Sequence, residues 1–138
     1  MKLLCKYLFL FLVGGVLYNL IEILFRGHTH WTMFIVGGVC FILLGLLNEV
    51  TDWEFPLLWQ AIDGGIIITL VEFVAGCIVN LWLGWGVWDY SNMPFNLLGQ
   101  ICLPFSAIWC VISIFGIVLD DYIRYIFFGE EKPRYYSI

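Results

Sequence analysis

Four apolar stretches of bilayer length dominate the sequence and leave little choice of fold. They run over residues 3–25, 31–48, 56–83 and 97–127, with short polar segments between them. A transmembrane helix needs about 20 apolar residues, because the hydrocarbon core is roughly 30 Å thick and a helix rises 1.5 Å per residue. The stretches are continuous and do not alternate, which favours helices over a β-barrel. The sequence therefore predicts one all-α membrane domain over residues 1–138, a bundle of four transmembrane helices.

The composition agrees with an integral membrane protein and excludes several functions. Hydrophobic residues make up 62% of the chain and charged residues 12%, about half the share of a soluble domain. Without a basic patch, nucleic acid is not an expected partner. Nucleotide-loop and hydrolase motifs are absent, so we predict no cofactor and do not favour an enzyme. The five cysteines are scattered and are interpreted as packing residues.

The basic residues predict the orientation of the chain in the membrane. Lys2 and Lys6 precede the first stretch, while Arg124, Lys132 and Arg134 close or follow the fourth. By the positive-inside rule, both termini are expected in the cytoplasm, in the cell (inner) membrane. The first stretch is longer than a signal-peptide core, so we expect it to be retained as a span.

The segment "WLGWGVWDYSNMPFN", residues 82–96, is the most loop-like part of the outer side. Its glycines, asparagine and proline favour turns, and its tryptophans favour the membrane interface. We expect an interfacial outer loop between the third and fourth helices. Pro104 lies in the fourth stretch, so that helix either starts after the proline or is kinked there, with Gln100 packed inward.

Glu72 is the sharpest functional candidate, because it lies near the middle of the third stretch. A charge at the bilayer centre costs on the order of 2.5–3.5 kcal/mol, so the residue must face the bundle interior, be protonated or be paired. Gly65, Thr69, Glu72, Gly76 and Asn80 follow at helical spacings and share one face. Two interpretations stay open: a functional acid, and a structural acid that ties helices together.

The other polar residues of the outer half predict a pocket that opens outward, with Glu72 at its base. Glu22 and Arg26 are four residues apart with the acid first, the favourable order for an ion pair. Glu72 would exchange a proton or bind a cationic group as this pocket opens and closes. The predicted substrate-binding residues are Glu72, Glu22, Arg26, Asn80, Asn19, Tyr18, His30, Asp89, Asn96 and Gln100.

The motif "RGHTHW" holds both histidines, His28 and His30. Residues two apart face opposite sides of a helix, so both can bind one metal only from an extended loop. A third ligand such as Glu22 or Asp89 would also be needed. We favour an external loop whose histidines lie at the rim of the pocket, and keep the metal site as an alternative.

A second polar group is expected at the inner side of the membrane. We interpret Asp120 and Asp121 as solvated acids at the inner interface, with Arg124 one turn further on to compensate them. The full group is Asn48, Glu49, Gln60, Asp63, Asp120 and Asp121, near Arg124.

The succession "YNLIEILFRGHTHWTMFIVGG", "LLNE", "ITLVEFVAGCIVN" and "VWDYSNMPFNLLGQICLPFSAIW" resembles small bacterial ABC transporter permeases of the CmpB-like, type IV group. The resemblance covers residues 17–109. It implies a separate ATPase subunit, and the small number of spans implies a homo-oligomer or a partner membrane subunit in the lipid bilayer. The polar and small positions that recur in the family correspond here to Glu22, Arg26, His30, Trp31, Asn48, Glu49, Glu72, Gly76, Asn80, Trp88, Asp89, Tyr90, Asn96, Gly99 and Gln100.

Three functional hypotheses follow. The first is a multi-pass transporter or permease-like subunit with a polar intramembrane pocket. The second is a non-transporting binding or assembly protein whose polar stripes only pack helices. The third is an intramembrane metal-dependent enzyme that uses His28, His30 and an acid.

Overall fold

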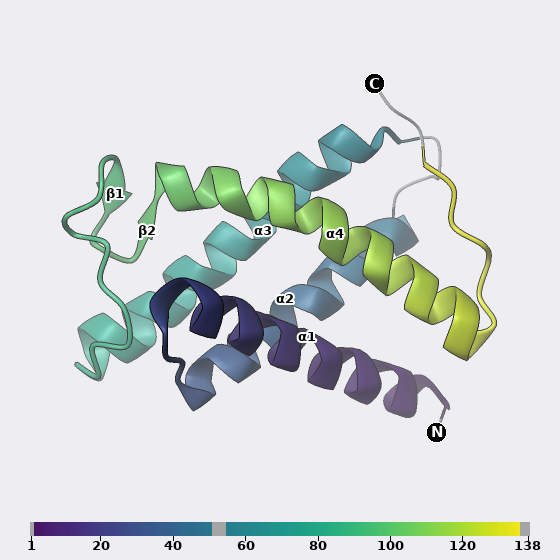
Figure 1. Ribbon diagram of the computed structural model, residues 1–138, viewed down its shortest axis with the longest axis horizontal. Helices are drawn as coiled ribbons and strands as arrows, with labels where there is room; N and C mark the ends of the chain where they lie inside the picture. The colour runs from purple at the N-terminus through teal and green to yellow at the C-terminus, as the bar shows by residue number, and fades with distance from the viewer. Residues whose placement is uncertain (1, 51–54, 136–138) are drawn as a thin grey trace.

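The computed structural model describes residues 2–50 and 55–135, and the predicted all-α architecture is confirmed (Figure 1). The structure names the following elements in chain order: α1 (Lys2–Arg26), α2 (Trp31–Val50), α3 (Leu57–Gly76), the π-helix η1 (Cys77–Trp82), β1 (Asn96–Leu97), β2 (Ile101–Cys102) and α4 (Leu103–Phe128).

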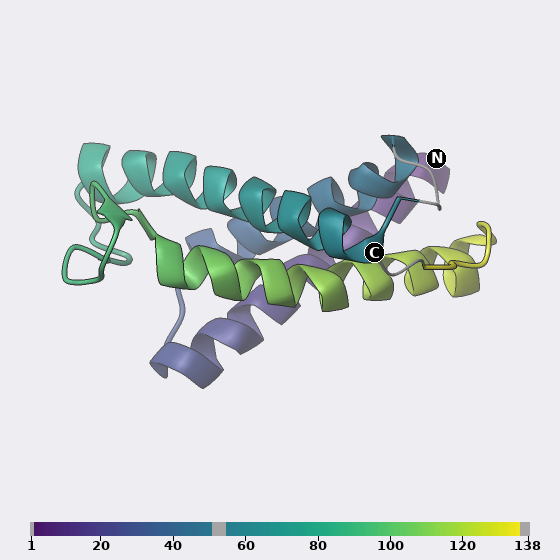
Figure 2. The same ribbon diagram turned by 90° about the horizontal axis from the view of Figure 1, so that it is seen from above.

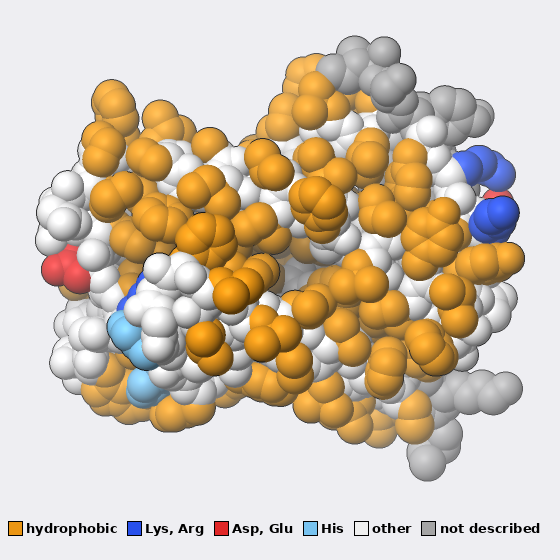
Figure 3. Space-filling view, in the orientation of Figure 1, with side chains coloured by type: hydrophobic (Ala, Val, Ile, Leu, Met, Phe, Trp, Pro, Cys, Tyr) orange, Lys and Arg blue, Asp and Glu red, His pale blue; other side chains and the backbone are white. Residues whose placement is uncertain are grey.

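Three of the helical segments are long and apolar enough to cross a membrane, namely Leu3–Arg26, Leu57–Trp82 and Leu103–Phe128. The apolar part of α2, Trp31–Leu47, is shorter, as the short second stretch predicts. In the turned view of Figure 2, α1 begins and α4 ends at one end of the bundle, opposite the β1–β2 hairpin. Hydrophobic side chains cover the middle of the face in Figure 3, and charged and histidine side chains gather at its ends. The fold is therefore a membrane bundle with polar ends.

Glycines set the closest helix contacts in the bundle. A Cβ atom at Gly14 would lie 2.7 Å from the carbonyl oxygen of Gly37, and one at Gly37 would lie 2.8 Å from that of Gly14. The backbones of α1 and α2 are therefore in direct contact, as small residues allow in membrane helices. On the other side, α3 packs along α4, and a Cβ atom at Gly64 would lie 2.7 Å from Ser113 Oγ.

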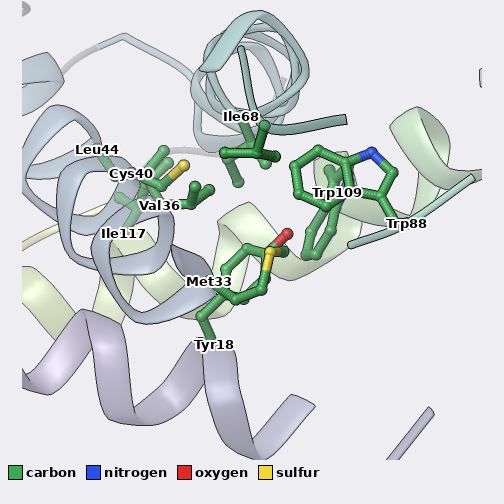
Figure 4. Packing of buried hydrophobic residues seen from close by; sticks show 10 residues of the cluster. Tyr18, Met33, Val36, Cys40, Leu44, Ile68, Trp88, Trp109 and Ile117 are labelled. Atoms are coloured by element: carbon green, nitrogen blue, oxygen red, sulfur yellow. The ribbon is translucent and has the colours of Figure 1, made fainter. Parts of the chain in front are cut away.

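The pairing of the helices leaves a seam between α1 and α4. Within the described residues these two helices are not among the pairs with extended backbone contact, since α1 packs on α2, α4 packs on α3, and α2 contacts both α3 and α4. Side chains bridge the seam at separate points. Toward the hairpin end, called outer after the orientation expected from the sequence, Tyr18 stacks on Trp109 with ring centroids 5.4 Å apart (Figure 4). At the opposite end, called inner on the same basis, Phe9 lies against Phe127, with centroids 5.9 Å apart.

The fourth helix begins at Leu103 and not at residue 97, so the predicted span is too long at its start. The residues before it form the β1–β2 hairpin, which reverses direction through left-handed backbone at Leu98 and Gly99. Pro104 lies in the first turn of α4, where its missing N–H group leaves no hydrogen bond unmade. The first of the two alternatives for this proline is therefore close to correct, and Gln100 is buried in the hairpin.

Candidate functional site

Glu72 lies in the interior of the bundle, where three neutral donors hold its carboxylate. Its side chain is only 2% exposed. Oε1 accepts hydrogen bonds from the hydroxyls of Tyr18 and Tyr90, each at 3.3 Å, and Oε2 accepts one from Trp109 Nε1 at 2.9 Å. The donors come from α1, from the segment between η1 and β1 (residues 83–95, called the outer segment below) and from α4. A single acid one turn before the end of α3 thus connects three other parts of the chain.

The rest of the polar face of α3 is used in packing. Thr69 Oγ1 donates to Ser106 Oγ of α4 at 2.9 Å. Further out, in η1, Asn80 Nδ2 donates to Gln100 Oε1 at 2.8 Å, and Asn80 Oδ1 accepts from the backbone N–H of Val87 at 2.6 Å. Both ends of the Asn80 amide are therefore engaged, and this residue fixes the outer segment to the end of α3.

The predicted ion pair between Glu22 and Arg26 is confirmed, with Arg26 Nη1 2.8 Å from Glu22 Oε2. Arg26 Nη2 also donates to the backbone carbonyl of Val87 at 2.7 Å. The same outer segment is thus attached to α1 by Arg26 and to η1 by Asn80. Glu22 is buried and Arg26 is partly buried, so the pair lies at the edge of the bundle and not in open solvent.

A cavity of about 320 Å³ lies between the end of α1, the outer segment and α4. Its charged lining residues are Glu22, Arg26 and Asp89, and most of the remaining wall is aromatic or aliphatic. Tyr90 and Trp109, two of the donors to Glu72, belong to this wall. Figure 3 shows the face hollowed between α1 and α4.

Two residues of the outer segment, Asp89 and Tyr90, have perturbed acidities that bear on this cavity. The backbone N–H of Ser91 donates to Asp89 Oδ1 at 2.8 Å and lowers the pKa of that carboxyl, so Asp89 carries a charge at neutral pH. Burial, and then the nearby Glu72 carboxylate, raise the pKa of Tyr90 above its usual value near 10. Tyr90 is therefore a neutral hydroxyl that donates to Glu72.

Only some of the predicted site residues line this cavity. Glu22, Arg26 and Asp89 do, while Tyr18 lines an adjoining apolar cavity. Glu72 lies behind the aromatic wall and does not line it, because its donors stand between the carboxylate and the opening. Asn80 and Gln100 lie behind the wall as well, bonded to each other.

The remaining predicted residues have local roles in loops. The hydroxyl of Thr29 donates to Asn19 Oδ1 at 2.9 Å, and Asn96 Nδ2 donates to the carbonyl of Met93 at 2.9 Å. His30 accepts the backbone N–H of Thr32 at Nδ1, 3.3 Å away. These bonds fix the α1–α2 turn and the outer segment, and these residues do not line the cavity.

The metal alternative finds no ligand set in the part of the chain that the structure describes. No group of three or more His, Cys, Asp or Glu side chains lies close enough there to hold an ion. The ring of His30 lies against Trp31 and Trp85, with centroids 5.6 and 6.1 Å away, and His28 is exposed.

Trp109 is the main residue that sequence reasoning missed. It contacts Glu72 directly, stacks on Tyr18 and separates the two cavities along the seam. Its signal in the sequence is its position inside an apolar helix, away from the stretch ends where an aromatic belt lies. A buried indole there needs an acceptor for its N–H group, and Glu72 is the acceptor.

At the inner end the prediction of solvated acids is wrong, because Asp120 is fully buried and Asp121 is 4% exposed. Arg124 Nε lies 3.2 Å from Asp120 Oδ2, one helical turn away. The chain beyond α4 folds back over this end, where the Tyr135 hydroxyl donates to Asp121 Oδ2 at 2.6 Å. Gly45 of α2 provides the space for the buried pair, since a Cβ atom there would lie 2.7 Å from Asp120 Oδ1.

Other members of the expected inner group are only partly associated with this pair. Gln60 is buried and Nε2 donates to the carbonyl of Phe55 at 2.8 Å. Lys6 Nζ lies 2.6 Å from Glu130 Oε2 and so joins the start of α1 to the segment after α4. The side chains of Asn48 and Glu49 lie outside the described part of the chain.

Comparison with known proteins agrees with the resemblance in the sequence. The model of one family, described as "Putative ABC-transporter type IV" (ABC_trans_CmpB), matches residues 7–128. No curated protein and no solved structure matches the chain. The matched region takes in nearly all of the four helices, together with Glu72 and the Asp120–Arg124 pair. Because the match spans most of its length, this membrane-embedded chain belongs to the type IV ABC-transporter family.

Proposed function

We propose that the chain is the membrane subunit of an ABC transporter and that the cavity lined by Glu22, Arg26 and Asp89 is its substrate-binding site. One observation carries the proposal. Two oppositely charged side chains near the outer end of a membrane helix face an open cavity, and ionisable residues in such positions mark substrate pathways. The volume falls within the range of small-molecule sites, roughly 300–1,000 Å³.

Glu72 acts in this proposal as a positioning residue. Through Tyr90 and Trp109 it fixes the aromatic wall of the cavity, so a change in its protonation changes the wall without contact with the substrate. Both oxygens of Glu72 accept hydrogen bonds. In Glu72→Gln one of them is replaced by an NH₂ group, which is a donor and would face the N–H or O–H group that is bonded there now. We therefore expect the wall to rearrange and transport to be lost while the chain still folds.

The proposed orientation puts both ends of the chain in the cytoplasm. Lys6, Arg124, Lys132 and Arg134 belong to the end where α1 begins and α4 ends, whereas Arg26 belongs to the other end. The cavity then opens in the outer half of the membrane. A separate ATPase subunit would act from the inner end, and a second copy or another membrane subunit would complete the pathway.

The test is ATP-driven flux into inside-out membrane vesicles from native cells, in which the proposed ATPase subunit is also present, with labelled decyltrimethylammonium, decyl sulfate and maltose as probes. The double variant Glu22→Gln/Arg26→Gln neutralises two of the three charged side chains of the cavity, leaves Asp89 in place, and introduces neutral side chains of similar length. Val111→Phe is a matched control, because Val111 is 57% exposed on the same helix as the cavity wall and lines neither cavity along the seam. We expect the double variant to lose flux of one probe and the control to keep it. Equal flux from both would overturn the proposed site.

A second candidate, a binding or assembly subunit, is favoured by one observation. The polar residues Thr69, Glu72 and Asn80 of the α3 face are all bonded within the chain, as a packing stripe requires. In that case no probe crosses the membrane, but the expressed chain is still required for its partner subunit to accumulate.

A further inference from the structure

A second cavity continues the first one along the seam between α1 and α4. It has a volume of about 210 Å³ and is almost entirely apolar. It shares Ile21, Trp109 and Ile112 with the first cavity, so the two are neighbours, and it extends inward to Gly14 and Leu119. The hollow that Figure 3 shows between the two helices lies on this seam.

The two cavities together have the dimensions of an amphiphile. The lining residues of α1 run from Gly14 to Arg26, roughly 18 Å of helix at 1.5 Å per residue. All the charged lining residues belong to the outer cavity. The inner cavity offers hydrocarbon side chains, glycines, the Cys40 thiol and the rings of Tyr18 and Trp109. A ligand that fills both therefore needs a polar head and an apolar chain.

The outer cavity indicates the charge of that head. Two carboxylates, Glu22 and Asp89, face one guanidinium, Arg26, which already binds Glu22 and the carbonyl of Val87. The excess charge is therefore negative. The wall also carries five aromatic rings, and aromatic faces attract cations, most strongly where water is excluded. These rings belong to Phe25, Trp88, Tyr90, Phe105 and Trp109.

We propose that the ligand of the seam is an alkylammonium amphiphile, with its ammonium head in the outer cavity between the aromatic rings and the carboxylates, and its hydrocarbon chain in the inner cavity past Trp109. The proposal rests on the proposed function, because it assigns a substrate class to the same site. The gap between α1 and α4 lets such a ligand enter sideways from the outer leaflet, with its chain already in hydrocarbon.

The experiment is saturable binding of labelled probes to the full chain in an uncharged maltoside detergent, with empty micelles subtracted. The probes are decyltrimethylammonium, tetramethylammonium, which has the head alone, and decyl sulfate, which has the opposite charge. We expect decyltrimethylammonium to bind at least about tenfold more tightly than either of the other probes. This factor corresponds to about 1.4 kcal/mol of binding free energy from the head or from the chain.

Two sets of variants separate the head from the chain. Ile112→Trp narrows the junction of the two cavities, so it is expected to lower decyltrimethylammonium affinity about tenfold and leave tetramethylammonium unchanged. Val111→Trp is the matched control, since the same bulk is added one residue away, outside both cavities. Glu22→Gln/Asp89→Asn conserves shape and is expected to weaken both ammonium probes and to leave decyl sulfate unchanged or tighter. This pair keeps the proposal testable if Ile112→Trp does not fold.

The outcomes distinguish this proposal from the proposed function. If decyl sulfate binds more tightly and Ile112→Trp, but not Val111→Trp, weakens it, the ammonium class is wrong and the site stands. If tetramethylammonium binds as tightly as decyltrimethylammonium and loses affinity in Glu22→Gln/Asp89→Asn, the chain contact is overturned and the site again stands. If Ile112→Trp and Glu22→Gln/Asp89→Asn leave the binding of every probe unchanged, the site itself is overturned.

Discussion

The outer and inner polar clusters both bury an acid in the bundle, but they hold it in opposite ways. Neutral donors from three elements hold Glu72, and two of those donors form the wall of a cavity. Asp120 is held by the guanidinium of Arg124 on its own helix, against the bare backbone of Gly45. Under the proposed function, this difference separates a cavity wall that responds to Glu72 from a closed packing unit around Asp120.

The largest expected effect comes from breaking the inner ion pair. Arg124→Leu leaves Asp120 buried without its guanidinium, and loss of one partner from a buried pair costs about 3–5 kcal/mol. The free energy of unfolding in detergent is the measurement. Arg134→Leu is the control, because the Arg134–Glu131 pair is exposed and such pairs contribute roughly 0–1 kcal/mol. If the two variants lose similar amounts of unfolding free energy, the Asp120–Arg124 pair is not a buried structural unit and the contrast with Glu72 fails.

Gly45→Ala tests the same unit without changing a charge. The added methyl group would lie within 2.7 Å of Asp120 Oδ1 and 2.9 Å of Arg124 Nη2, and overpacking of a buried site costs about 1–3 kcal/mol. Gly129→Ala is not a suitable control, since Gly129 has a φ of 67°. Gly116→Ala is suitable, because its methyl group would meet only the flexible end of Leu44, at 3.0 Å. An unchanged stability in Gly45→Ala would mean that the inner cluster is not closely packed.

Glu72→Gln tests whether the acid near the outer end is held differently from Asp120. One of the buried donors loses its acceptor, so we expect a loss of about 1–2 kcal/mol in unfolding free energy, less than for Arg124→Leu. Ligand binding and flux are expected to fall by a larger proportion than stability does. If flux is retained and stability falls as far as in Arg124→Leu, Glu72 is a packing residue like Asp120.

The smallest effect is expected from Tyr135→Phe, which removes the hydrogen bond to Asp121 at a cost of about 1 kcal/mol. Burial, and then this hydrogen bond, raise the pKa of Tyr135 in the folded chain above the unfolded value near 10. The stabilisation is therefore complete below pH 10 and is lost as pH rises through the folded pKa. Denaturation is measured at several pH values from 8 to 11. The free energy of unfolding should decrease less steeply with rising pH for the variant than for the wild type. An identical slope would mean that Tyr135 does not contribute.

The sequence predicts those parts of the molecule that depend on one helix at a time. The four apolar stretches, the Glu22–Arg26 pair and the interior position of Glu72 all follow from length, spacing and depth. The seam between α1 and α4 does not, because it depends on which helices pair through their glycines. The sequence does not predict the hairpin before α4 either, since residues 97–102 are about as apolar as the helix that follows them.

Two residues show why the clusters themselves were harder to predict. The burial of Asp120 depends on Gly45 of another helix and on the chain that folds back after α4, neither of which is visible in its own neighbourhood. The sequence does not distinguish Trp109 from the apolar residues around it, although its indole N–H group is what places an aromatic wall between Glu72 and the cavity.

The proposed ligand site is the seam between α1 and α4. The most direct test is the rate at which a maleimide modifies Ile112→Cys and, as the neighbouring control, Val111→Cys, with the wild-type labelling of native cysteines subtracted. Saturating decyltrimethylammonium is expected to slow modification at position 112 several-fold and to leave position 111 unchanged. Equal protection at both positions, or none at position 112, would contradict the account.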